Sequence, residues 1–406
     1  MRSGLTSSIT VNHFPVTGGS VLKKKTIELL VADLNYGTGA EYGWKAKKDL
    51  VAVGTDAVEP VIEAVRTGNA NVVFFGAMVL GEIGDNRAVP ALIEMLEQES
   101  SDGDVKLEIA EALGRIGDPR AFVPLINSWI YGNWRIKDEF APCDEQIMEV
   151  VFWALKKIGK IPLDPITNGL RADTPEARRR AAELLIQFPR KAATDRLLET
   201  VDDPDKIVRH KCVIALGCIK DKKALSTLER KLKDDMFAEV RSAAAGALGR
   251  TRNPESVPAL VSAMMDPDHS VRRSAANALH RLSWKPQTTG ERVRYNIAHQ
   301  RWDMVVSGYT ASIEPLVYLL KNGSLCPKDE IIKTLGEIRD ADAVPALTES
   351  IEYMVNLKRR NWYHHCCIRD AFIALMKMPT MSPEHAATIG RLMEMYLLLD
   401  TSRPYP

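Results

Sequence analysis

The chain has 406 residues, with 54 Lys and Arg against 53 Asp and Glu, which gives a formal net charge of +1 at pH 7. This balance excludes a protein that holds a polyanion through its overall field, so nucleic acid or an acidic membrane would need a local basic surface. No run of 18 apolar residues occurs and the first 20 residues lack the order of a secretory signal, which predicts a soluble, cytoplasmic protein without a membrane segment.

One phrase recurs along the chain. It reads Leu-Gly-x-Ile-Gly-Asp from Leu80 and from Leu113, and shorter copies begin at Leu216, Leu248 and Leu335. Its period is about 31 residues, the size of a repeated supersecondary unit.

Each unit is predicted to contain two helices. Apolar residues at helical spacing, with Ala where helices must approach closely, mark the second helix, as at Val240, Ala244 and Leu248. We expect the Gly after the leucine, and the Gly-Asp or Asn-Pro that follows it, to end that helix, and Pro90 fits in the first turn of the next one. The predicted fold is all-α, an α-solenoid of about ten stacked helix pairs that cover one another's apolar faces.

The predicted segments follow in chain order. A disordered arm over 1–21 precedes a single solenoid over 22–399, and a tail over 400–406 follows it. The solenoid consists of helical segments, which cover 22–53, 54 to about 282, 290–306, 310–338, 342–377 and 382–399. Three insertions interrupt its period, near 127–145, 284–308 and 350–364.

The recurring phrase resembles the short HEAT-like repeat that phycobilisome bilin lyases share with many prokaryotic proteins. The resemblance covers most of residues 54–377. It implies a superhelix of helix pairs, and because the matching residues are those that build the pair, it does not fix a function.

A second periodicity places an aspartate and an arginine six residues apart in each of four consecutive repeats. The pairs are Asp173 and Arg179, Asp203 and Arg209, Asp235 and Arg241, and Asp266 and Arg272. Two interpretations stay open. The arginines could form the polar floor of a binding face on the concave side of the solenoid. Alternatively, the charges form a structural ladder between repeats, which would neutralise their field and disfavour nucleic acid as a partner.

Aromatic residues gather in two of the insertions. Trp129, Tyr131 and Trp134 lie in the first, and Trp362 and Tyr363 lie in the last. Insertions at the same point of a repeat project from the same edge of a solenoid, so these rings form a candidate binding edge. The alternative is that they pack over the ends of longer helices.

Catalytic and metal-binding patterns are weak. The run from His364 to Cys367 points in different directions on a helix and has no second ligand cluster at zinc spacing. Deoxyhypusine hydroxylase, a HEAT-like enzyme, binds iron through His-Glu pairs, and none of the eight histidines of this chain precedes a glutamate. We therefore expect no catalytic residue, no metal and no cofactor.

The function predicted from these features is a non-enzymatic scaffold that binds another protein through its concave face and its aromatic edge. Two alternatives stay open. One is an accessory factor that resembles bilin lyases and handles a tetrapyrrole or its carrier protein. The other is a HEAT-like protein that binds nucleic acid.

Overall fold

The computed structural model describes residues 20–35, 41–98, 103–132, 144–308, 310–323, 328–357, 362–379 and 381–400. Within these ranges every regular element is a helix and no strand occurs. The predicted arm and tail lie almost entirely outside them. The chain divides into two compact units, residues 1–187 (unit 1) and 188–406 (unit 2).

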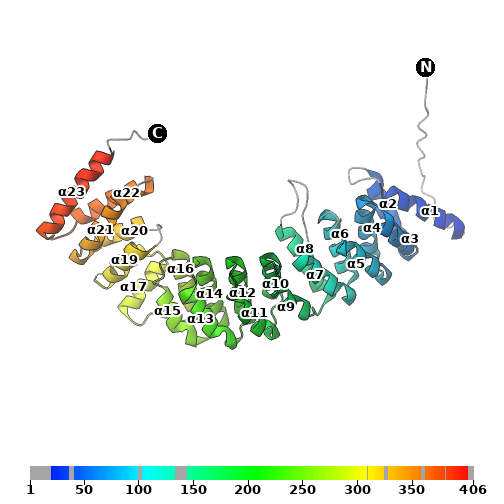
Figure 1. Ribbon diagram of the computed structural model, residues 1–406, viewed down its shortest axis with the longest axis horizontal. Helices are drawn as coiled ribbons and strands as arrows, with labels where there is room; N and C mark the ends of the chain where they lie inside the picture. The colour runs from blue at the N-terminus through cyan, green and yellow to red at the C-terminus, as the bar shows by residue number, and fades with distance from the viewer. Residues whose placement is uncertain are drawn as a thin grey trace, which may run out of the picture. The chain divides into compact units, whose positions relative to one another are not determined.

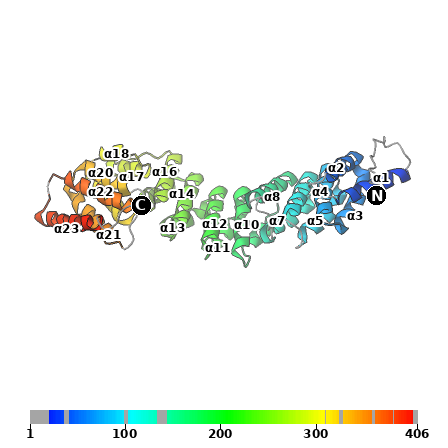
Figure 2. The ribbon, with the colours of Figure 1, turned by 90° about the horizontal axis from the view of Figure 1, so that it is seen from above.

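Unit 1 is a stack of helix pairs in two layers (Figures 1 and 2). The first helices of its pairs are α1 (Ser20–Asp33), α3 (Val58–Thr67), α5 (Val89–Glu97), α7 (Phe122–Tyr131) and α9 (Asp164–Gly169). The second helices are α2 (Glu41–Val53), α4 (Ala70–Ile83), α6 (Gly103–Ile116), α8 (Asp144–Ile158) and α10 (Pro175–Gln187). Short 3-10 turns precede three of the first helices: η1 (Gly54–Ala57), η2 (Asn86–Ala88) and η3 (Pro119–Ala121).

Unit 2 repeats this arrangement. Its first helices are α11 (Thr194–Thr200), α13 (Leu225–Asp234), α15 (Val257–Ala263), α19 (Thr310–Asn322) and α21 (Val344–Val355). Its second helices are α12 (Lys206–Ile219), α14 (Ala238–Thr251), α16 (His269–Arg281), α20 (Lys328–Ile338) and α22 (Trp362–Met376), and α23 (Pro383–Asp400) packs on α21. The predicted insertion over 284–308 contains α17 (Thr289–Ala298) and α18 (Trp302–Val306). The 3-10 turns of this unit are η4 (Lys191–Ala193), η5 (Lys222–Ala224), η6 (Pro254–Ser256) and η7 (Ala341–Ala343).

The recurring leucine forms the core of each pair. Leu80, Leu113, Leu216, Leu248 and Leu335 have no exposed surface, so each contributes about 1.5–3 kcal/mol of hydrophobic stabilisation. Together with the consecutive packing of second helices, this burial confirms the predicted all-α solenoid fold. None of the described helices is both long and apolar enough to cross a membrane.

The glycine after that leucine has a different role from the predicted one. Gly217 and Gly249 lie inside their helices, where an added Cβ would come within 2.7 Å of the Ala247 Cα and 2.8 Å of the Ala278 Cα. These glycines therefore allow neighbouring second helices to approach closely. The helices end three residues later, at left-handed residues such as Gly84 (φ 75°) and Lys220 (φ 59°).

Candidate functional site

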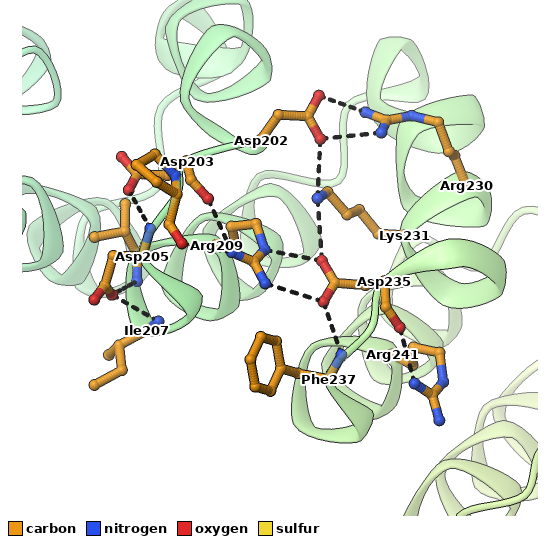
Figure 3. A network of polar contacts seen from close by, with 12 residues as sticks. Asp202, Asp203, Asp205, Ile207, Arg209, Arg230, Lys231, Asp235, Phe237 and Arg241 are labelled. Atoms are coloured by element: carbon orange, nitrogen blue, oxygen red, sulfur yellow. Dashed lines mark hydrogen bonds and ion pairs between the residues drawn. The ribbon is translucent and has the colours of Figure 1, made fainter.

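The repeated aspartates and arginines of unit 2 bond across consecutive repeats (Figure 3). Arg209 Nε and Nη2 donate to the two carboxylate oxygens of Asp235 at 2.9 and 3.3 Å, and Arg241 bonds to Asp266 in the same way at 2.8 and 2.9 Å. Each arginine also donates from Nη1 to the backbone, Arg209 to the Asp203 carbonyl at 2.9 Å and Arg241 to the Asp235 carbonyl at 2.8 Å. We call this set the arginine ladder.

Asp235 is the most connected member of the arginine ladder. Besides Arg209, it accepts bonds from Lys231 Nζ at 3.1 Å and from the Phe237 backbone N–H at 3.1 Å. Burial acts to raise the pKa of Asp235, but these bonds outweigh it and hold the pKa below its usual value. Lys231 also bonds to Asp202, whose pKa falls to about 2, chiefly because Arg230 donates to it.

The predicted pair of Asp173 and Arg179 lies differently. Arg179, in α10, bonds to Glu176 at 2.5 Å and to Glu183 at 3.2 Å within its own helix. Its neighbour Arg178 makes the backbone contacts typical of the ladder, at 2.8 Å to the carbonyls of Ala172 and Asp173. In this repeat the position of the ladder arginine is therefore 178, one residue before the predicted one.

The last arginine of the ladder is enclosed. Arg272 is 2% exposed and donates to the carbonyls of Asp266 and Pro267, both at 2.9 Å. Burial lowers its pKa, and its Nε has no acceptor among the described residues. The ladder arginines of unit 2 bond to other groups of the protein. We therefore do not propose that they form the floor of a binding face.

The predicted aromatic edge is only partly described. Trp129 is 3% exposed, packs edge-on against Phe152 with ring centroids 5.7 Å apart, and donates from Nε1 to the Arg180 carbonyl at 3.2 Å. Tyr131 is exposed. Trp129 thus packs inside unit 1, as the alternative interpretation expects.

The remaining predicted aromatics do not form an edge that can be described. Trp134 lies outside the described residues, and the side chain of Trp362, at the start of α22, is not described either. Tyr363 donates its hydroxyl to Asp329 at 3.2 Å. Burial is the main cause that raises the pKa of Tyr363, so the hydroxyl stays protonated at neutral pH.

A surface hollow of unit 1 brings together residues that the sequence did not single out. It lies between α6 and α8, has a volume of about 250 Å³, and is lined by Glu111, Glu149, Val150 and Trp153. We call it the α6–α8 hollow. Glu149 and Trp153 are four residues apart on α8, so their side chains are neighbours on one helix face.

The ring of Trp153 packs against the neighbouring helix along one edge and is partly exposed to solvent. Its Cζ3 lies 2.8 Å from the position that a Cβ would take at Gly114, so the indole occupies the space left by that glycine. The side chain is 37% exposed, and the ammonium group of Lys157 lies 5.8 Å from the ring centroid. The ring therefore already attracts a cation.

The carboxylates around the hollow are unevenly paired. Glu111 bonds to Arg115 at 2.6 Å, whereas the exposed Glu149 makes no hydrogen bond or ion pair with the described residues. Glu108, one turn before Glu111, is 7% exposed and also has no such partner in the described part of the chain.

Glu108 is the buried carboxyl of this cluster. The pKa of Glu108 is raised to about 7, chiefly by burial and also by the nearby charges of Glu111 and Glu82, against the opposing effect of Arg115 and Lys47. Lys47 and Arg115 also pair with Glu82, which binds Lys47 and lies 3.5 Å from Arg115. The two cations therefore do not neutralise Glu108 and Glu111 alone. Lys157 is a third cation beside the Trp153 ring, so the four glutamates of this region exceed the three nearby cations by one.

No metal centre is found in the described ranges. Among these residues, no group of three or more His, Cys, Asp or Glu side chains could hold a metal ion, including the run from His364 to Cys367.

The chain is similar to curated deoxyhypusine hydroxylases. It is 29% identical to that of Candida albicans over 230 residues, which cover 50% of this chain and 71% of the relative. It is 26% identical to that of Rattus norvegicus over 250 residues, which cover 56% of this chain and 80% of the relative. Because these relatives carry the name of an enzyme, the prediction of a non-enzymatic scaffold is wrong, and its two alternatives gain no support from them.

The chain also matches two solved structures. Human deoxyhypusine hydroxylase in complex with glycerol is 21% identical, with a TM-score of 0.28, over 65% of this chain and 98% of that one. Kap121p is 14% identical, with a TM-score of 0.45, over 95% of this chain and 48% of that one.

A model of HEAT repeats matches residues 58–136, 163–235 and 230–289. Together these segments make up half of the chain, and they follow the helix pairs of the two layers. The chain belongs to the HEAT-repeat family.

Proposed function

We propose that the chain binds an alkylammonium group in the α6–α8 hollow. The observation that carries this proposal is Glu149, a carboxylate without a partner among the described residues, one helical turn from a Trp153 ring that already lies near an ammonium group. A primary ammonium has three N–H donors, so it can bond to Glu149 and Glu111 together while its carbon chain lies on the indole.

A second candidate function is hydroxylation of deoxyhypusine, which the names of the curated relatives suggest. The chain does not fit the iron that such enzymes hold through His-Glu pairs. None of its eight histidines precedes a glutamate, and no cluster of metal-binding side chains gathers in the part of the chain that the structure describes. The donor set for iron is therefore not found, and ammonium binding is the function that the side chains support better.

Titration with n-butylammonium chloride, followed by isothermal calorimetry, tests the ammonium site. Glu149→Gln removes an exposed charge, and Trp153→Leu removes the ring while keeping an apolar side chain. Each is expected to weaken binding about two- to fivefold, because exposed ion pairs and exposed cation–π contacts each contribute about 0.5–1 kcal/mol.

The matched control is Glu63→Gln, which removes an exposed glutamate of α3 that does not line the hollow. It should leave binding unchanged. Equal weakening by Glu63→Gln, or equal binding of uncharged n-butanol, would contradict the proposal.

The same titration should depend on pH. Glu108 has a pKa of about 7, so it gains a negative charge beside Glu111 between pH 6 and pH 8. The ligand keeps its charge in this range, since alkylammonium groups titrate near pH 10. Binding should therefore strengthen as the pH rises, and Glu108→Gln should remove most of that dependence.

A further inference from the structure

A second, larger hollow lies in unit 2 on the layer of second helices. It is lined by residues of α12, α14 and α16 and has a volume of about 480 Å³. Small residues of α14 form its floor, among them Ser242, Ala243 and Gly246. A Cβ added at Gly246 would meet nothing within 4 Å, so open space lies above it. We call this feature the α14 groove.

Two serine hydroxyls give the floor hydrogen-bonding capacity. Ser242 Oγ lies 2.8 Å from Ser274 Oγ and 3.4 Å from the Ser270 carbonyl. A hydroxyl rotates about its C–O bond and has two acceptor lone pairs besides its donor, so both groups can also bond to a ligand in the groove.

One end of the groove carries two arginines outside the arginine ladder. Arg250 lies in the last turn of α14 and Arg281 in the last turn of α16. Neither forms an ion pair with a described residue, and Arg250 Nη1 is buried without a hydrogen-bond acceptor among those residues. A buried donor without an acceptor is costly, so this end of the groove carries an arginine whose hydrogen-bonding capacity the described residues do not fully use.

The other end of the groove has a different charge. Glu239 lies in the first turn of α14, and His210 lies beside it on α12. Burial lowers the pKa of His210, as does Lys211, against the opposing effect of Glu239, so the imidazole is neutral at pH 7. An anion is therefore repelled at the Glu239 end and attracted at the arginine end, which fixes the orientation of a ligand.

We infer that the α14 groove binds a small molecule that carries an oxyanion, either a phosphate monoester or a carboxylate. The oxyanion bonds to Arg250 and Arg281, and other polar atoms of the ligand bond to Ser242 and Ser274. This inference does not depend on the ammonium site, which lies in unit 1.

Calorimetric titration of the full chain at pH 7.5 and low salt tests the groove, with methyl phosphate and acetate as probes. Arg250→Gln is expected to weaken binding at least about tenfold, because it removes a charge-assisted bond and keeps the length of the side chain. Arg252→Gln is the matched control, since this exposed arginine lies two residues further on and does not line the groove.

A second variant tests the groove by filling it. Gly246→Leu introduces a strong helix former above open space, so it should keep the helicity measured by circular dichroism and abolish binding of both probes. Tighter binding of methyl phosphate than of acetate would identify phosphate as the ligand group, and the reverse order would identify carboxylate.

Three outcomes would overturn the inference. The first is that the unchanged protein binds neither probe at about 10 mM. The second is that Arg250→Gln and Gly246→Leu bind as the unchanged protein does. The third is that Arg252→Gln weakens binding as much as Arg250→Gln, which would show a general surface attraction instead of a built site.

Discussion

Replacing Asp235 by Ala removes the carboxylate that joins two consecutive repeats of unit 2. Three charge-assisted bonds end on it: two from Arg209, at 2.9 and 3.3 Å, and one from Lys231 at 3.1 Å. Removing one partner of a buried ion pair costs about 3–5 kcal/mol. Arg209 keeps the Asp203 carbonyl and Lys231 keeps Asp202, so we expect a loss near the lower limit, about 3 kcal/mol.

Urea unfolding measures this loss, with hydrogen exchange of the α12 and α14 amides to report on unit 2 itself. The matched control is Asp195→Ala. It breaks a pair with Lys223 in which the two side chains are 72% and 64% exposed, so it should cost less than about 0.5 kcal/mol. If both variants lose the same free energy of unfolding, the buried bonds of the arginine ladder do not stabilise the repeats.

Four further substitutions test other features. Gly249→Ala should lower the melting temperature by overpacking against Ala278, whereas Gly246→Ala, on the same helix but above open space, should raise it, because Ala is the better helix former by about 1 kcal/mol. Asn69→Ala removes the side chain that caps α4 and should cost about 1 kcal/mol in urea unfolding. Glu108→Gln should stabilise the chain by about 2–3 kcal/mol at pH 8, where the fold holds a buried carboxylate whose pKa is raised to about 7. This gain should disappear below about pH 4, where Glu108 is protonated in the folded and the unfolded chain alike.

The fold was predictable because its signals are local and recur. The leucine at 216 or 248 is buried in the same way in each repeat, and the proline at 90 lies in the first turn of α5 as expected. The role of Gly249 was not predictable from its neighbours in the sequence. Its absence of a Cβ matters because Ala278, 29 positions later, approaches it, and only the stacked structure shows that contact.

The ladder shows where spacing alone misleads. A distance of six residues fits Asp173 and Arg179, yet the arginine at this level is Arg178. Within its own repeat a ladder arginine bonds to backbone carbonyls, which any residue supplies, so the identity of residue 172 leaves no signal. The aspartate of each predicted pair bonds to the arginine of the preceding repeat, as Asp235 does to Arg209.

The two hollows could not be predicted for a related reason. Small residues on a second helix serve close packing at Gly249 and an open floor at Gly246, and the sequence does not distinguish these uses. Trp153 gave no signal either, because at its position in α8 it continues the apolar pattern of a core helix. Its ring packs into the space at Gly114 on the neighbouring helix, a contact that only the stacked structure shows.

The arginine ladder also determines where unit 2 tolerates shortening. Arg241 finds its carboxylate 25 positions downstream, in the turn that leads into α16. A chain cut after α14 would keep that helix complete. The guanidinium of Arg241 would then lose both bonds to Asp266 and keep only its bond to the Asp235 carbonyl. A shortened chain should therefore end after the turn that contains Asp266. The ion pairs of the ladder cross the sequence boundary between two repeats.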